Sequence, residues 1–386
     1  MKTYISDDAS KDINSGFKDF DAVYVNNADQ YQKKDYERLL NTEKNKSIEL
    51  WAWKNDKAAA EFAVLCAKDI KNVTLTASDL SGNAGVISSS KVQLAFIKDV
   101  KAYTGHAGWY ANNPKNIMPR GKREYYPEVI YSDAPVSVAK DDFQLVWLEV
   151  STDKDTKAGL YNGAITVSAE NTEKTVTLNY SIEILDLIMP EPENYRFDVE
   201  YWSHPYNVAY YYDVEPFSDK HIHILKQHML LYKNLGGHAI TASIVEEAWG
   251  GQTYGGGNTI HYPSMIKWIK KADKEWNFDF THFDKWVELN KSIGIADKII
   301  CYSMMPWNGI IKYFDESKQK YKKVRVNPAR KSNYEKVWLP FLKAFVNHLD
   351  EKDWFDSTYI GFDERRNMET ALDLIDMVQN KDGFVL

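Results

Sequence analysis

The sequence contains little cysteine, with two residues in 386, Cys66 and Cys301. Two cysteines exclude a disulfide framework as the basis of the fold. Each lies in an apolar run, which predicts a buried small hydrophobic side chain, and a nucleophilic cysteine is the less favoured alternative. HExxH and CxxC spacings are missing as well, and His221 and His223 alternate where they cannot converge as an i, i+4 pair. We therefore expect both histidines at the surface, no metal site and no cofactor.

Long apolar stretches and a surplus of basic residues are also missing. No run approaches the roughly 20 apolar residues of a membrane-spanning helix, and the first residues, MKTYISDD, lack the apolar core of a signal peptide. These features predict a cytoplasmic protein without a membrane span; a secreted protein whose leader has been lost or replaced is the alternative. The 48 Lys and Arg against 55 Asp and Glu give a net charge of −7, so we expect no nucleic-acid partner.

Aromatic residues, by contrast, are abundant: 12 Trp, 25 Tyr and 16 Phe. The apolar C–H face of a sugar packs well against a flat aromatic ring, so this composition points to carbohydrate binding. For any single aromatic residue, packing inside a protein core is the commoner role. The chain is also longer than the roughly 250–300 residues at which a single core splits, which predicts two domains.

The character of the sequence changes near residue 190. Before this point, short apolar or alternating segments are bounded by turn residues, which predicts a β-sandwich accessory domain over residues 1–190. The sequence Pro-Glu-Pro at 190–192 marks the boundary, because proline cannot continue a sheet ladder. The predicted strands are 47–53, 60–67, 72–77, 143–150, 163–169 and 175–184.

After the boundary, predicted strands alternate with predicted helices. In the first helix, helical spacing places Ile224, His228, Leu231 and Leu235 on one face. Pro340 within the third helix predicts a kink or a later start. The predicted strands are 196–202, 239–245, 298–303 and 357–362, and the predicted helices are 221–235, 283–292, 334–349 and 368–378.

Four successive strand–helix units need parallel strands with right-handed crossovers. A TIM-type barrel and a doubly wound sheet both provide them. Long polar and aromatic segments after the first three strands, 201–219, 246–262 and 304–326, favour the barrel, whose active sites lie on such loops. The lack of a Gly-rich phosphate turn after the first strand weakens the Rossmann alternative. We expect residues 191–386 to form the N-terminal half of a (β/α)8 catalytic barrel, in a fragment of a longer protein or in one that a partner completes.

The sharpest motif is YIGFDER at residues 359–365, a strand that ends in Asp363 and Glu364. Neighbouring residues of a regular strand face opposite ways, so both carboxylates reach one ligand only if the chain bends there. Two like charges would then raise one of the two pKa values, and glycosidic cleavage needs one protonated and one ionised carboxyl group. The alternative is a surface pair that caps the next helix and pairs with Arg365 or Arg366.

Further candidates for substrate binding follow the first three strands, at the rim where Asp363 is expected. Indole rings could stack on a sugar, and the imidazole, carboxylate and amide groups could bind its hydroxyls. Loop packing, or a solvated charge, is the alternative for each of them. We expect the three tyrosines at 210–212 to pack in a loop or to form a distal subsite. The candidates are Trp202, His204, Glu247, Trp249, Trp307 and Asn308, with Glu246 beside them.

With these motifs the sequence resembles glycoside hydrolase family 123, the retaining β-N-acetylgalactosaminidases. The resemblance rests on LVWLEV at 145–150, AGLYNG at 158–163, the junction at Pro190 and the strand that ends in Asp363 and Glu364. It implies removal of terminal β-linked N-acetylgalactosamine from an oligosaccharide or glycolipid glycan, with the sugar's own acetamido oxygen as nucleophile. It also implies that Glu364 is the general acid and base and that Asp363 orients the acetamido group.

Two other functions stay open from the sequence. A sugar-binding protein on a degenerate barrel would bind without turnover, and an adhesive protein would use the β-sandwich as its working part. The pair of adjacent carboxylates argues for the enzyme, because binding alone does not require both.

Overall fold

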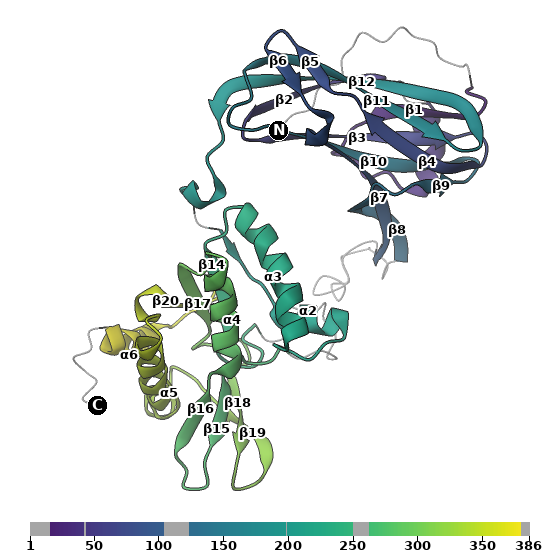
Figure 1. Cartoon of the computed structure of the whole chain (residues 1–386). Coiled ribbons are helices and arrows are strands. Elements are labelled where there is room, and N and C mark those ends of the chain that lie inside the picture. Colours follow the sequence, from purple (N-terminus) through teal and green to yellow (C-terminus); the bar gives the residue numbers. More distant parts are fainter. Residues whose placement is uncertain (1–15, 42–43, 104–122, 198, 250–261, 380–386) are drawn as a thin grey trace. The chain divides into compact units, whose positions relative to one another are not determined.

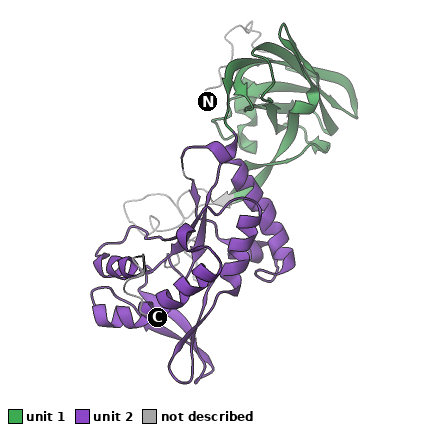
Figure 2. Ribbon diagram, turned by 60° about the vertical axis from the view of Figure 1, so that its left-hand side comes forward, with its two compact units in different colours: residues 1–190 green, residues 191–386 purple. Residues whose placement is uncertain are grey.

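The computed structural model describes residues 16–41, 44–103, 123–197, 199–249 and 262–379. The chain divides into two compact units, residues 1–190 and residues 191–386 (Figure 2). Each unit has its own hydrophobic core.

The first unit is rich in β-structure, as predicted (Figure 1). One sheet has the order β1-β3-β10-β7-β8, and the other has the order β2-β12-β11-β4-β9, with β5 and β6 beside β11. Apolar residues alternate along the strands, so that one face of each sheet lies in a shared core; Ile48, Leu50 and Ala52 are the buried positions of β2. The strands are β1 (Phe20–Val25), β2 (Ser47–Lys54), β3 (Lys57–Cys66), β4 (Ile70–Ala77), β5 (Leu80–Gly82), β6 (Gly85–Ile87), β7 (Val92–Tyr103), β8 (Arg123–Ser132), β9 (Val136–Val138), β10 (Asp142–Ser151), β11 (Gly159–Ala169) and β12 (Thr172–Ile188).

A short helix, α1 (Tyr36–Asn41), contributes to a second apolar cluster on the other face of strands β1, β3 and β10. Leu39 packs there with Leu65 and Leu145. The Tyr36 hydroxyl donates a hydrogen bond of 2.7 Å to the carbonyl oxygen of Cys66. Cys66 itself is fully buried, as predicted, and burial raises the pKa of its thiol to about 12.

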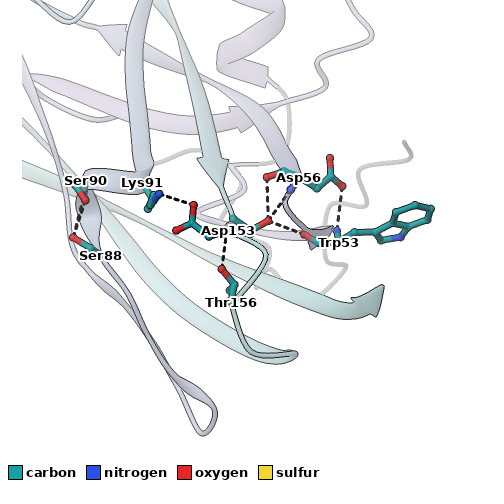
Figure 3. A network of polar contacts seen from close by, with 8 residues as sticks. Trp53, Asp56, Ser88, Ser90, Lys91, Asp153 and Thr156 are labelled. Atoms are coloured by element: carbon teal, nitrogen blue, oxygen red, sulfur yellow. Dashed lines mark hydrogen bonds and ion pairs between the residues drawn. The ribbon is translucent and has the colours of Figure 1, made fainter. Parts of the chain in front are cut away.

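A polar network fixes the turn between β2 and β3 to the end of β10 (Figure 3). The Asp56 carboxylate accepts from the Trp53 backbone N–H at 3.1 Å, and the Thr152 hydroxyl donates to the Trp53 carbonyl at 2.7 Å. The next residue, Asp153, pairs with Lys91 at 2.7 Å. These contacts satisfy backbone groups that the sheet ladder leaves open at its end.

The second unit contains a four-stranded parallel sheet in the order β13-β14-β17-β20. Spatial order follows chain order, and helices occupy the connections, as expected for successive strand–helix units. The first strand is much shorter than the predicted 196–202. The elements are β13 (Glu200–Tyr201), α2 (Pro205–Tyr212), α3 (Asp219–Asn234), β14 (Ala239–Ser243), α4 (Thr281–Ser292), β17 (Lys298–Tyr302), α5 (Lys331–Glu351), β20 (Thr358–Ile360) and α6 (Glu369–Gln379).

Helix α5 is continuous from Lys331 to Glu351 with Pro340 inside it, so the predicted later start is wrong. The helix begins three residues earlier than predicted. None of the helices in the described ranges has both the length and the apolar character needed to cross a membrane.

The face of α3 that packs is not the one formed by Ile224, His228, Leu231 and Leu235. Leu231 and Leu235 are 67% and 70% exposed, and His228 is exposed as well. The helix carries apolar residues on two sides, so spacing alone does not identify the face that packs. The buried face consists of His221, Leu225, Met229 and Tyr232.

His221 is fully buried, so its prediction as a surface residue is also wrong, whereas His223 is exposed as expected. The His221 Nδ1 atom accepts from the backbone N–H of Phe217 at 2.8 Å, and its Nε2 atom lies 2.9 Å from the Pro205 carbonyl oxygen. Both ring nitrogens therefore have backbone partners, which offsets the cost of burying a polar side chain. His221 connects the start of α2 to the start of α3.

A second sheet, in the order β16-β15-β18-β19, was not predicted. It consists of two hairpins that extend away from the parallel sheet (Figure 1). One face packs on the core, where the Trp268 ring stacks on Phe341 of α5 at 4.7 Å between centroids. The strands are β15 (Lys267–Lys270), β16 (Trp276–Asp279), β18 (Ile310–Asp315) and β19 (Lys320–Arg325).

We predict that Gly163→Ala destabilises the first unit. A Cβ atom at Gly163 would lie 2.7 Å from Cζ of Tyr180 and 2.9 Å from Cγ of Leu80, both fully buried side chains. Overpacking of this kind costs about 1–3 kcal/mol, measurable by urea unfolding. The control is Gly16→Ala, where a Cβ meets nothing within 4 Å. Equal unfolding midpoints for the two variants would contradict the packing.

Candidate active site

The carboxyl ends of β13, β14, β17 and β20 lie at one edge of the parallel sheet, because the strands run in the same direction. The candidate residues predicted from the sequence follow these four ends. Trp202 and His204 follow β13, Glu247 and Trp249 follow β14, Trp307 and Asn308 follow β17, and Asp363 and Glu364 follow β20.

Asp363 and Trp307 are in direct contact. The Trp307 Nε1–H donates to Oδ2 of Asp363 at 2.6 Å. The backbone N–H of Trp307 donates to the carbonyl oxygen of Ala248 at 3.0 Å, and the Arg365 guanidinium lies 5.0 Å from the Trp307 ring centroid, within the range of a cation–π contact. The segments that follow β14, β17 and β20 are thus joined around one half-buried carboxylate.

The chain bends as it leaves β20. Glu364 has a φ of 43°, in the left-handed region that few residues with a side chain adopt. The backbone at Glu364 therefore departs from the regular strand conformation. Asp363 is directed to Trp307, and the side chain of Glu364 is exposed. In the described part of the chain, neither carboxylate forms an ion pair with Arg365 or Arg366.

Gly361 allows the end of β20 to approach its neighbour closely. Its backbone N–H donates to the carbonyl oxygen of Cys301 at 2.9 Å. A Cβ atom at Gly361 would lie 2.6 Å from Cζ of Tyr302. The Tyr302 ring thus occupies the space next to the strand that carries Asp363.

An aromatic cluster surrounds Tyr302. The Trp202 ring centroid lies 5.6 Å from that of Trp249 and 5.3 Å from that of Tyr302, and Trp249 and Tyr302 are 5.1 Å apart. Trp202 is 40% exposed, whereas Trp249 is 1% exposed. Trp202 therefore offers its surface to a ligand, while Trp249 fits the alternative of packing and supports Trp202 from below.

Tyr302 and Glu200 were not among the predicted site residues. The Tyr302 hydroxyl donates to Oε1 of Glu200 at 3.0 Å. Burial raises the pKa of Tyr302, and the charges of Glu200 and Asp363 raise it further. Tyr302 is therefore a neutral hydrogen-bond donor. The signal in the sequence was its position at the end of the third parallel strand.

His204 lies beside the same cluster. Its ring makes edge-to-face contacts with Tyr262 at 4.4 Å and Trp249 at 5.1 Å between centroids. Burial lowers the pKa of His204 to about 4. The imidazole is therefore neutral near pH 7, and a neutral imidazole offers one donor and one acceptor nitrogen.

The remaining candidates make local contacts. Oε1 of Glu247 accepts from the backbone N–H of Tyr262 at 2.5 Å, and Oδ1 of Asn308 accepts from that of Ile310 at 2.9 Å. Glu246 pairs with Lys312 at 2.7 Å between Oε2 and Nζ. These groups shape the segments after β14 and β17.

Within the described ranges, no group of three or more His, Cys, Asp or Glu side chains is arranged to hold a metal ion. Cys301 is fully buried, and burial raises the pKa of its thiol well above the usual range. A nucleophile is the thiolate form of cysteine, so Cys301 is a core residue, as predicted.

The second unit is thus an α/β domain whose strand ends carry two adjacent carboxylates and an exposed indole. Profiles of glycoside hydrolase 123 match the chain twice, with the catalytic domain at residues 202–385 and the N-terminal domain at residues 24–169. The chain belongs to glycoside hydrolase family 123.

A solved family 123 glycoside hydrolase from Clostridium perfringens, described in terms of glycolipid glycan hydrolysis, is similar to this chain. Its TM-score is 0.85 and its sequence identity 32%, and the match covers 95% of this chain and 62% of that one. This chain thus spans about 62% of the length of that structure. The match to the CooA pilin subunit from enterotoxigenic Escherichia coli covers 45% of this chain and 99% of that one. Its TM-score of 0.23 and its identity of 12% are too low to indicate a shared fold. A search of curated protein sequences finds no match.

We predict that His204 makes folding sensitive to acid. Its pKa in the folded chain, about 4, lies below the ordinary histidine value of 6.5, so the unfolded chain takes up a proton at higher pH than the folded chain does. This contribution to stability is complete above about pH 6.5 and is lost as the pH falls toward 4. The loss between pH 7 and pH 5 is about 2 kcal/mol.

Urea unfolding at pH 7 and pH 5 measures this loss. His204→Gln should show a smaller difference than wild type, while His223→Gln, at an exposed position of α3, should match wild type. Burial also lowers the pKa of His221 and His282, so only the difference between variants is informative. The same acid sensitivity in wild type and His204→Gln would show that His204 does not contribute.

Proposed function

We propose that this protein removes terminal β-linked N-acetylgalactosamine, or N-acetylhexosamine, from glycans by a substrate-assisted retaining mechanism. Membership of family 123 supports a glycosidase, and the similar Clostridium perfringens enzyme supports a glycolipid glycan as substrate. The observation that carries the proposal is the hydrogen bond from Trp307 to Asp363, next to the bend at Glu364.

In this mechanism the acetamido oxygen of the sugar attacks the anomeric carbon and forms an oxazolinium intermediate. Asp363 accepts a hydrogen bond from the acetamido N–H and stabilises the positive charge that develops there. Trp307 binds Oδ2, and in this proposal Oδ1 of the same carboxylate binds the acetamido group.

Glu364 acts first as an acid and then as a base. It donates a proton to the leaving oxygen and later takes one from the water that opens the intermediate. The proton taken from water in the second step replaces the one given up in the first, so Glu364 ends the cycle as it began. Because the nucleophile belongs to the sugar, the two carboxylates need not flank the substrate at the roughly 5 Å spacing of other retaining enzymes.

Trp202 and His204 bind the sugar ring in this proposal. The exposed indole of Trp202 stacks on the C–H face, and the neutral imidazole of His204 bonds a hydroxyl. Trp249 and Tyr302 keep Trp202 in position. Glu247 and Asn308 hold the loops that border the site.

We further propose that the parallel sheet is part of a TIM-type barrel. Four parallel strands in chain order, with helices in the connections, support this topology. The placement of the candidate residues at the carboxyl ends of the strands is also typical of such barrels.

We predict that Glu364→Gln and Asp363→Asn each lower kcat by about 10²–10⁴-fold. The first change removes the proton donor, and the second removes the charge that stabilises the intermediate. The assay is turnover of an aryl β-N-acetylgalactosaminide, and the control is Glu369→Gln, an exposed residue in the first turn of α6. Wild-type turnover in both variants would refute the assignment.

Calorimetry distinguishes the proposed glycosidase from the alternative, a protein that binds the sugar without catalysis. Titration with N-acetylgalactosamine that shows binding, together with no turnover by the wild-type protein, would favour it. An adhesive protein that works through the β-sandwich would show no thermal protection by the sugar.

Trp307→Phe tests the positioning of Asp363. The variant keeps a ring under Arg365 but loses the N–H donor, and a hydrogen bond to a charged group contributes roughly 1.5–3 kcal/mol. We expect kcat to fall about tenfold or more, with little change in KM. Trp276→Phe is the control, because Trp276 makes ring contacts in the hairpin sheet. Unchanged kcat in Trp307→Phe would mean that the hydrogen bond does not position the carboxylate.

A further inference from the structure

The outward face of the hairpin formed by β18 and β19 carries cations and aromatic rings together. Residues directly opposite in an antiparallel pair share a face. Ile311 and Val324 are one such pair, and they pack on the core. The other face therefore points outward. It consists of three opposed pairs, which we call the strip: Ile310 and Arg325, Lys312 and Lys323, and Phe314 and Tyr321.

The aromatic pair at the outer end of the strip is flanked by lysines. The Phe314 and Tyr321 ring centroids are 5.4 Å apart. Lys312 Nζ lies 4.9 Å from the Tyr321 ring, and Lys267 Nζ lies 5.9 Å from the Phe314 ring. Tyr321 is 58% exposed, so its ring is available to a ligand.

The hairpin is basic within an acidic chain. Residues 310–325 contain six Lys and Arg against two Asp and Glu, a net charge of +4, whereas the whole chain carries −7. Lys322 pairs with Asp315 on the other face, and Lys312 pairs with Glu246. Across the part of the chain that the structure describes, Lys323 and Arg325 form no ion pair.

The strip begins at the candidate active site. Trp307, the partner of Asp363, lies three residues before Ile310, and the backbone N–H of Val326 donates to the Gly309 carbonyl at 2.8 Å to close the base of the hairpin. Lys312 reaches Glu246, which follows β14 at the same edge. From Ile310 to Phe314 a strand advances about 13 Å. A ligand bound at Asp363 can therefore continue along the strip.

We propose that the strip binds an acidic sugar, one that carries a carboxylate or sulfate group, in the part of the glycan beyond the residue that is removed. The Tyr321 ring would pack on the sugar's C–H face, and Lys323 and Arg325 would bind the anionic group, for which guanidinium is well suited. This inference rests on the proposed function and names a class of substrate for the same site.

The observations favour a glycan over an anionic membrane surface. The hairpin turns, residues 271–275 and 316–319, mix both signs of charge and contain no large apolar residue, so they have no group to insert between lipids. The cations and rings of the strip instead lie along the strands, next to the candidate site.

Two substrates test the proposal: β-N-acetylgalactosaminides that differ only in whether the adjoining sugar carries a carboxylate or sulfate group. The double variant Lys323→Gln, Arg325→Gln should lower kcat/KM for the acidic substrate about tenfold and leave the neutral one unchanged. Tyr321→Ala should lower kcat/KM for the acidic substrate as well. The control, Lys320→Gln, lies on the other face of β19, opposite Asp315, and should behave as wild type.

Direct binding is measured separately. Calorimetric titration of the acidic oligosaccharide into Glu364→Gln should show binding that salt weakens and that the double variant loses. Equal kcat/KM for the two substrates in wild type would overturn the inference and leave the proposed function intact. Strip-dependent binding without turnover of either substrate would refute the proposed function alone. Strip-dependent binding to phosphatidylserine vesicles, with no effect on the acidic glycan, would also overturn the inference.

Discussion

The hydrogen bond between Trp307 and Asp363 is the interaction on which the candidate site depends. A half-buried carboxylate at a strand end needs a donor, since burial of a charge without one is costly. The indole that supplies it is itself fixed, by the Ala248 carbonyl and by Arg365 over its ring. One contact thereby aligns the exits of three strands that lie far apart in the sequence, and the Asp363 carboxylate takes its direction from them.

Packing beneath the site supplies the second constraint. Tyr302 fills the space that Gly361 leaves open, and it contacts both Trp202 and Trp249. A larger residue at Gly361 would displace the Tyr302 ring and, through it, the exposed indole. The abundance of aromatic residues thus has a mainly structural explanation, and Trp202 is an exception because a buried layer presents it to solvent.

The sequence was sufficient to predict those features that depend on a local pattern of residues. Apolar runs bounded by turn residues gave the parallel strands and helices, and the position of Asp363 and Glu364 after the last strand drew attention to the pair. Prediction from the sequence failed where contacts between distant elements determine which side chains are buried. His221 looks like a surface residue until its bonds to Pro205 and Phe217 are known, and α3 has two apolar sides of which one packs. The strands of the hairpin sheet were missed because they are short, and two of them are rich in lysine, KWIK and KYKKVR.

The hairpin sheet also changes the electrostatics of this edge. Asp363 and Glu364 place two acidic groups at the strand ends, and such charges repel an acidic ligand over roughly the 8 Å of physiological screening. Lys312 pairs with Glu246, which follows β14 at this edge. Arg325, opposite Ile310, lies at the base of the strip, and Lys323, opposite Lys312, lies one pair farther out along the strands. In the proposed function, one substrate would contact the carboxylates at the strand ends and then the cations along the strip.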